Sequence, residues 1–241
     1  MQILRTTQEL ATYLENTDSK IGCFADTSFL YGVAYDDDRL FERAEKVHDL
    51  LAEYSTPIYA NVISRMEFID LILRKQLTAG CIELLSQIDR NFENSELYKL
   101  LKLIRDKNTE AKRENESYKV NEGQIKRLRK LIVDSTTKTD WRKFCANYTG
   151  ALLVSEWQLL EDELGLNFIE ILEGDTSKFF KEPLRWNDMV QTMGRHGMRG
   201  PDAMIANLFA RSNFPLLITG DSDFEGCFED WATPDKAIFI L

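Results

Sequence analysis

The sequence predicts an α/β fold, with a mostly parallel central sheet flanked by helices and a long helical insertion. Short apolar runs alternate with segments in which apolar residues recur at helical spacing, and this alternation is typical of parallel sheets. Residues 78–165 instead contain one helical pattern after another, with few glycines and no proline. We therefore expect residues 1–77 and 166–241 to form the two parts of the sheet domain, with residues 78–165 inserted between them.

Residues 1–77 contain the patterns of two strands and three helices. Thr6 or Thr7 is suited to cap the first helix, because a Thr hydroxyl can accept a hydrogen bond from a free amide at a helix start. Pro57 follows the second helix and ends it, because proline disfavours helical geometry in the preceding residue. We expect helices at 6–16, 37–54 and 62–75 and strands at 21–25 and 57–60. The buried stripe of the third helix is expected to be Val62, Met66, Ile69 and Leu73.

The insertion is amphipathic and unevenly charged. Its expected stripes are Leu97, Leu100, Leu101 and Ile104; Ile125, Leu128, Leu131 and Ile132; and Trp141, Phe144, Tyr148, Leu152, Trp157 and Leu160. Between residues 99 and 130 there are 11 Lys or Arg and 5 Asp or Glu, whereas the whole chain has a net charge of −10. A basic segment in an acidic protein permits a polyanionic partner, although such residues are more often a solvated helix face.

Residues 166–241 return to alternating strands and helices. A strand is expected at 167–172, helices at 186–197 and 200–211, and a final strand at 237–241. Residues 216–218 are continuously apolar, as in a strand that is buried on both faces of the sheet. Pro201 suits the first turn of its helix, where no amide hydrogen bond is lost.

Acidic residues follow two of the predicted strands directly. Asp26 follows the strand at 21–25, and Asp221 and Asp223 follow the strand at 216–218. Right-handed crossovers bring the carboxyl ends of parallel strands to one edge of the sheet, where α/β proteins bind ligands. Like charges repel unless a cation lies between them, and oxygen ligands suit Mg²⁺ or Mn²⁺ rather than zinc. The alternative is a solvated, Asp-rich turn.

Two further acids lie on predicted helices near this edge. Asp202 shares a helix face with Ile205, Ala206 and Phe209, so its carboxylate lies at the start of an apolar face. An unpaired charge is costly in such a position. Glu67 lies at the border of an apolar stripe, and the simpler interpretation is a solvated acid. Glu173 and Asp175, after the strand at 167–172, are weaker candidates.

Composition excludes several functional classes. There is no apolar run of 18 residues and no secretion-signal pattern, and the four cysteines are far apart, so we expect a cytoplasmic protein with free thiols. His48 and His196 have no Cys or His at a metal-ligand spacing. The phosphate-binding loop of ATPases is absent.

The acidic motifs resemble those of the PIN domain, the nuclease fold of VapC-type toxins. The segment from Asp26 through Thr27 and Ser28 to Leu30 is similar to the family's first acidic motif, and Glu67 matches the second acid. Asp202, after Pro201, is similar to the third. The sequence Thr-Gly-Asp-Ser-Asp-Phe at 219–224 resembles the family's Thr-x-Asp-x-Asp-Phe signature, with Asp221 as the fourth acid and Asp223 as an accessory. The resemblance covers residues 20–77 and 166–241.

The resemblance implies cleavage of single-stranded RNA by an endoribonuclease that uses Mg²⁺ or Mn²⁺. It implies Asp26, Glu67, Asp202 and Asp221 as catalytic residues, and Asp26, Asp202, Asp221 and Asp223 as metal ligands. We expect substrate contacts from Thr27, Ser28, Thr219, Arg195 and Arg199, although the two arginines could equally belong to a solvated loop. Partners expected by analogy are single-stranded or structured RNA, a protein inhibitor (antitoxin) and a second copy of the chain, but no membrane.

Two other functional classes stay open at this point. The acidic net charge is compatible with a PIN scaffold that binds RNA or protein without cutting. Clustered acids on an α/β fold also occur in metal-dependent DNA nucleases and phosphatases.

Overall fold

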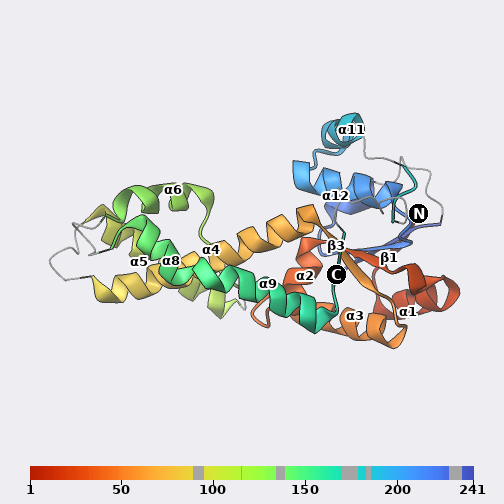
Figure 1. Ribbon diagram of the computed structural model, residues 1–241, viewed down its shortest axis with the longest axis horizontal. Helices are drawn as coiled ribbons and strands as arrows, with labels where there is room; N and C mark the ends of the chain where they lie inside the picture. The colour runs from red at the N-terminus through yellow and green to blue at the C-terminus, as the bar shows by residue number, and fades with distance from the viewer. Residues whose placement is uncertain (89–94, 115, 134–138, 170–178, 183–185, 228–234) are drawn as a thin grey trace. The chain divides into compact units, whose positions relative to one another are not determined.

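The computed structural model (Figure 1) describes the chain except for residues 89–94, 115, 134–138, 170–178, 183–185 and 228–234. The chain divides into two compact units. One comprises residues 1–36, 40–68 and 160–241 and is called the sheet unit; the other comprises residues 37–39 and 69–159 and is called the helical unit. The helical unit therefore begins at residue 69, inside a helix, and not at the expected residue 78.

In the described part of the sheet unit, six strands form one parallel sheet, which confirms the predicted α/β class. The spatial order is β1-β6-β5-β2-β3-β4. The strands are β1 (Gln2–Leu4), β2 (Cys23–Ala25), β3 (Ile58–Asn61), β4 (Asn167–Ile169), β5 (Leu216–Thr219) and β6 (Ala237–Ile240). β5 is buried along its whole length, as its continuous apolar run predicts. β1 was not expected; two of its three residues are exposed, so it lacks the continuous buried run that marks a central strand.

Helices cover both faces of this sheet (Figure 1). Helices α1 (Thr7–Asn16), α2 (Thr27–Ala34) and α3 (Phe41–Glu53) lie on one face, and α11 (Trp186–His196), α12 (Gly200–Arg211) and α13 (Asp223–Cys227) on the other. The strand order explains this arrangement: right-handed crossovers that run from β1 to β2 to β3 and those that return from β4 to β5 to β6 must pass on opposite faces. α1 has a complete capping box between Thr6 and Glu9, and Pro201 lies in the first turn of α12.

A buried lysine ties the end of α12 to the sheet. Lys236, just before β6, is 7% exposed, and its Nζ donates to the carbonyl oxygens of Phe209, Ser212 and Phe214 and to the hydroxyl of Ser212. Burial lowers the pKa of Lys236 to about 7. Phe209 lies in the last turn of α12, and Ser212 and Phe214 lie between α12 and β5, so one ammonium group joins the helix end to the segment that leads into the strand.

Helix α4 (Val62–Gln87) is longer than expected, and its buried stripe is different. Met66 is 65% exposed, whereas Ser64, Phe68 and Ile72 are buried, so the predicted stripe is wrong. The reason is a polar anchor at the helix start, where Asn61 Oδ1 accepts hydrogen bonds from the amides of Ile63 and Ser64. The Ser64 hydroxyl in turn donates to the carbonyl of Ala25 at 3.2 Å, and this sets the rotation of the helix.

The helical unit contains the end of α4, α5 (Glu96–Arg113), α6 (Glu122–Leu131), α8 (Trp141–Tyr148) and most of α9 (Gly150–Leu164). Its core includes the expected α5 stripe and Leu128, Ile132 and Phe144. Leu152 is 41% exposed and does not belong to the buried stripe that was predicted for it. Gly80 is required in α4, because a Cβ there would lie 2.6 Å from the ring of Tyr148.

Candidate carboxylate site

The candidate site lies where β2 and β5 end side by side. The two strands are paired in parallel, and the amide of Asp26 donates to the carbonyl of Ile218 at 3.0 Å. The chain leaves β2 toward helices on one face and leaves β5 toward helices on the other. This pair of strands is therefore the topological switch point of the sheet, where open α/β folds bind ligands.

Asp26 is the buried centre of the site. Its side chain is 5% exposed, and its Oδ2 accepts hydrogen bonds from the hydroxyls of Ser28 at 2.7 Å and Thr219 at 2.8 Å. Burial raises the pKa of Asp26, while these hydroxyls and the first amides of α2 oppose the increase. The carboxylate is thus held in one orientation by one hydroxyl from α2 and one from β5.

The turn after β5 is built around the same hydroxyls. The Ser28 hydroxyl accepts from the amide of Gly220 at 2.7 Å, and the Thr219 hydroxyl accepts from the amide of Asp221 at 3.0 Å. Asp221 Oδ1 then accepts from the amide of Asp223 at 2.8 Å. A Cβ at Gly220 would lie 3.3 Å from the Ser28 side chain and 2.5 Å from Leu40 Cδ1, so glycine leaves room for both side chains at this turn. Thr27, Ser28 and Thr219, expected to contact substrate, therefore also position the acids.

Glu67 is joined to the site through Thr27. The hydroxyl of Thr27 donates to Glu67 Oε2 at 3.0 Å. Burial, and then the negative charge of Asp26, raise the pKa of Glu67 to about 7. The orientation of α4 that places Ser64 against Ala25 thus also turns Glu67 toward the end of β2. Glu67 is therefore not the fully solvated acid of the simpler interpretation of the sequence.

Asp202 enters from the other face of the sheet, in the first turn of α12. Its neighbours on the helix, Ile205, Ala206 and Phe209, are buried, as the sequence pattern predicts. Burial, followed by the charges of Asp26 and Asp221, raises the pKa of Asp202 to about 6, and the positive charge of Arg199 opposes this increase. The electrostatic interactions show that acids from four separate segments share one region.

The remaining predicted residues are distributed around this region. Arg199 is exposed at the start of α12 and interacts electrostatically with Glu67 and Asp202. Asp223 is exposed and also interacts with Asp202. Arg195 lines a different cavity, between α11 and α12. Glu173 and Asp175 lie outside the described residues.

Two polar residues where β3 leads into α4, Asn61 and Ser64, support the site and were not predicted to do so. Asn61 and Ser64 are fully buried, and Ser64 contacts the site through its carbonyl, which accepts from the Thr27 hydroxyl at 3.3 Å. The sequence does contain an indication of this role for Asn61, because an Asn between an apolar strand and a helical pattern is a typical helix cap. Asn61 Nδ2 has no hydrogen-bond partner among the described residues.

The donor set consists only of carboxylate and hydroxyl oxygens, which suits Mg²⁺ or Mn²⁺. Within the described ranges, no group of three or more Asp, Glu, His or Cys side chains is already arranged to hold a metal ion. The acids are thus electrostatically coupled without forming a complete coordination shell. A divalent cation would relieve the repulsion that, together with burial, raises the pKa values of Glu67 and Asp202.

Comparisons of the chain with protein-family models, curated proteins and solved structures find no match. Among the helices that the structure describes, none is both long enough and apolar enough to cross a membrane.

Proposed function

We propose that this protein is an endoribonuclease that requires Mg²⁺ or Mn²⁺ and hydrolyses phosphodiester bonds of single-stranded RNA. The observation that carries the proposal is the convergence of Asp26, Glu67, Asp202 and Asp221 at the switch point, from four separate segments. Mutually repelling carboxylates, of which Asp26 is buried and the other three are half-buried, are costly for folding, and a cation-dependent function explains their presence.

In the proposed mechanism, Asp26, Asp202, Asp221 and Asp223 would hold the cation. The bound cation would supply positive charge to the scissile phosphate and would lower the pKa of a water molecule. Ser28 and Thr219 keep the Asp26 carboxylate in one orientation, and Thr27 does the same for Glu67. Arg199, exposed beside these acids, contributes a positive charge near the phosphate.

RNA as the substrate is supported by the PIN-like motifs and by the basic segment of the helical unit. Lys126, Arg127, Arg129 and Lys130 are exposed on α6. Exposed basic side chains bind phosphates without reading sequence, and they would let an acidic protein retain a polyanionic strand.

The test is cleavage of a labelled single-stranded RNA with Mn²⁺ and with EDTA. We expect Asp26→Asn and Asp221→Asn to abolish cleavage while the proteins remain folded. Asp49→Asn, an exposed acid on α3, is the control and should cut as the wild type does. Equal cleavage by wild type and Asp26→Asn would refute the proposal, and single- and double-stranded DNA in parallel reactions would detect a DNA nuclease.

A second candidate is a scaffold that binds RNA or protein without cutting. It is favoured by the lack of a preformed metal-ligand group in the described part of the chain. Calorimetry distinguishes the two candidates: a scaffold would show no heat of Mn²⁺ binding and would leave bound RNA intact.

A further inference from the structure

The sheet unit contains a cavity of about 390 Å³ between α11 and α12, apart from the carboxylate site. This volume lies within the range of pockets that enclose small ligands. The lining is mainly polar: Lys181, Glu182, Asp188, Gln191, Thr192, Arg195, His196, Asn207, Ala210 and Arg211. Three of these residues are Lys or Arg and two are acidic, a positive balance in a protein whose net charge is −10.

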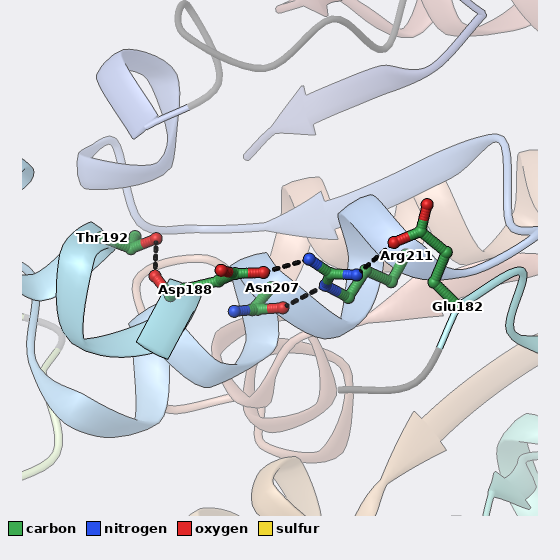
Figure 2. A network of polar contacts seen from close by, with 5 residues as sticks. All are labelled: Glu182, Asp188, Thr192, Asn207 and Arg211. Carbon is green, nitrogen blue, oxygen red and sulfur yellow. Dashed lines mark hydrogen bonds and ion pairs between the residues drawn. The ribbon is translucent and has the colours of Figure 1, made fainter. Parts of the chain in front are cut away.

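Arg211 lines this cavity, and its guanidinium lies within a network of polar contacts (Figure 2). Its Nε donates to Asn207 Oδ1 at 3.0 Å, one terminal nitrogen donates to Glu182, and the other donates to Asp188. Asp188 is one turn before Thr192 on α11, and its carbonyl accepts from the Thr192 hydroxyl at 2.9 Å. All three guanidinium nitrogens therefore have protein acceptors, and two carboxylates offset the positive charge.

This arrangement determines which ligand chemistry the wall favours. A guanidinium whose edges are hydrogen-bonded within the protein offers a ligand its flat face, and guanidinium planes stack on nucleobases. A phosphate is a poorer ligand for Arg211, because Glu182 and Asp188 would repel it. Phosphate would instead lie against Lys181 and Arg195, which are exposed where they line the cavity.

Amide groups complete the lining. Asn207 is fully buried on α12 with its Oδ1 bonded to Arg211, so Gln191, which is exposed on α11, is the amide that a ligand can reach. A side-chain amide can both donate and accept, as the edge of a nucleobase requires.

The cavity is connected to the carboxylate site by α12. Asp202 is in the first turn of this helix and Arg211 is its last residue. At about 1.5 Å per residue, the two positions are separated by about 13 Å along the axis. An RNA strand bound at the carboxylates would therefore reach the cavity with a nucleotide that is not adjacent to the reacting phosphate.

We propose that the cavity between α11 and α12 is a nucleotide subsite, in which a nucleobase stacks on Arg211 and contacts Gln191, and its phosphate contacts Arg195 and Lys181. The assignment of this nucleotide to an RNA strand rests on the proposed ribonuclease function. The proposal that the cavity binds a nucleotide does not rest on the ribonuclease function, because no acid of the carboxylate site lines the cavity.

The experiment is a calorimetric titration of the full chain with each ribonucleoside 5′-monophosphate and with inorganic phosphate, in EDTA. Gln191→Ala removes an exposed amide that lines the cavity, and Ala210→Leu fills the space. Asn187→Ala is the matched control, because Asn187 is an exposed amide one turn away on α11 and does not line the cavity.

We expect at least one nucleotide to bind more tightly than inorganic phosphate, with affinity at least tenfold lower in Ala210→Leu and several-fold lower in Gln191→Ala. Asn187→Ala should match the wild type. Absence of nucleotide binding by the wild type would overturn the proposed subsite, and so would unchanged affinity in Gln191→Ala. Because Gln191 is exposed, its substitution should not disturb folding, so a lower affinity can be attributed to the lost amide. Because these titrations need neither metal nor cleavage, their failure is separate from failure of the RNA-cleavage test.

Discussion

Thr219 donates a hydrogen bond of 2.8 Å to the carboxylate of Asp26, which lies 193 residues earlier in the chain. The same hydroxyl accepts from the amide of Asp221 at 3.0 Å. One side chain at the end of β5 thus connects two acids of the candidate site and the two strands that form its base.

Replacing Thr219 by Val should destabilise the protein and reduce RNA cleavage. The buried Asp26 carboxylate would lose a donor and the Asp221 amide an acceptor, at a cost of about 1–3 kcal/mol in the free energy of unfolding. Urea denaturation measures this cost. Thr56→Val is the matched control, since Thr56 is equally buried and its hydroxyl has no partner among the described residues, so stability should be unchanged or higher. Equal effects of the two substitutions would contradict a specific role for Thr219.

Glu67 should make the metal-free protein less stable as the pH rises. Its folded-state pKa is raised from 4.5 to about 7, so the folded state binds the proton more tightly than the unfolded state. The free energy of unfolding then falls as the pH rises between about 4.5 and 7. Glu67→Gln should match the wild type at pH 5 and be more stable at pH 8 in EDTA.

Thermal unfolding at the two pH values measures the effect of Glu67. Glu42→Gln, at an exposed position on α3, is the control for removal of one negative charge. A wild-type protein more stable than Glu67→Gln at pH 8 in EDTA would show that the carboxylate is not destabilising.

Mn²⁺ should raise the thermal stability of the wild type, because a ligand that binds only the folded state stabilises it. At about 100 times the dissociation constant the gain is about 2.7 kcal/mol. Asp26→Asn and Asp221→Asn should lose this gain, and EDTA should reverse it in the wild type, whereas Asp49→Asn should keep it. The same increase in unfolding temperature for Asp26→Asn would place the bound ion elsewhere.

Lys236→Met should lower the free energy of unfolding by at least about 2 kcal/mol. The substitution removes the donor to the buried carbonyls of Ser212 and Phe214, whereas the Phe209 carbonyl keeps the amide and hydroxyl of Ser212 as donors. Each unsatisfied buried group costs about 1–3 kcal/mol. Urea denaturation checks this, with Lys46→Met at an exposed position on α3 as the control. A loss no larger than that of the control would mean that other donors replace Nζ.

The basic residues of α6 should contribute to RNA affinity through charge alone. Each phosphate contact contributes about 0.7 to the slope of log affinity against log salt for a single strand, so Arg129→Ala with Lys130→Ala should reduce the slope by about 1.4. Fluorescence anisotropy with a labelled RNA measures it. Arg142→Ala with Lys143→Ala removes the same two residue types from exposed positions on α8, outside the basic segment. Identical salt-dependence slopes for the two double variants would show that the basic residues of α6 contribute no more to RNA binding than those of α8.

Local patterns determined much of the fold. The continuous apolar run of β5, the capping residue of α1 and the Pro at the start of α12 each act over a few residues, and the structure has these elements where the sequence predicts them. The face of Asp202 was also predictable, because the i+3, i+4 and i+7 positions follow from helical geometry alone.

The rotation of α4 and the polar supports of the acids were decided only by tertiary structure. Periodicity favoured a stripe that includes Met66, but the hydrogen bonds of Asn61 and Ser64 rotate the helix so that Phe68 is buried and Glu67 is turned toward Thr27. The Asn61 cap is local, but the bonds from Ser64 to Ala25 and from Thr27 to Glu67 join residues 39 and 40 positions apart, and no local spacing encodes them. The sequence by itself determined which residue types lie at the strand ends. The tertiary structure decided which of these side chains contact one another, because only strand order and helix rotation bring distant side chains within hydrogen-bonding distance.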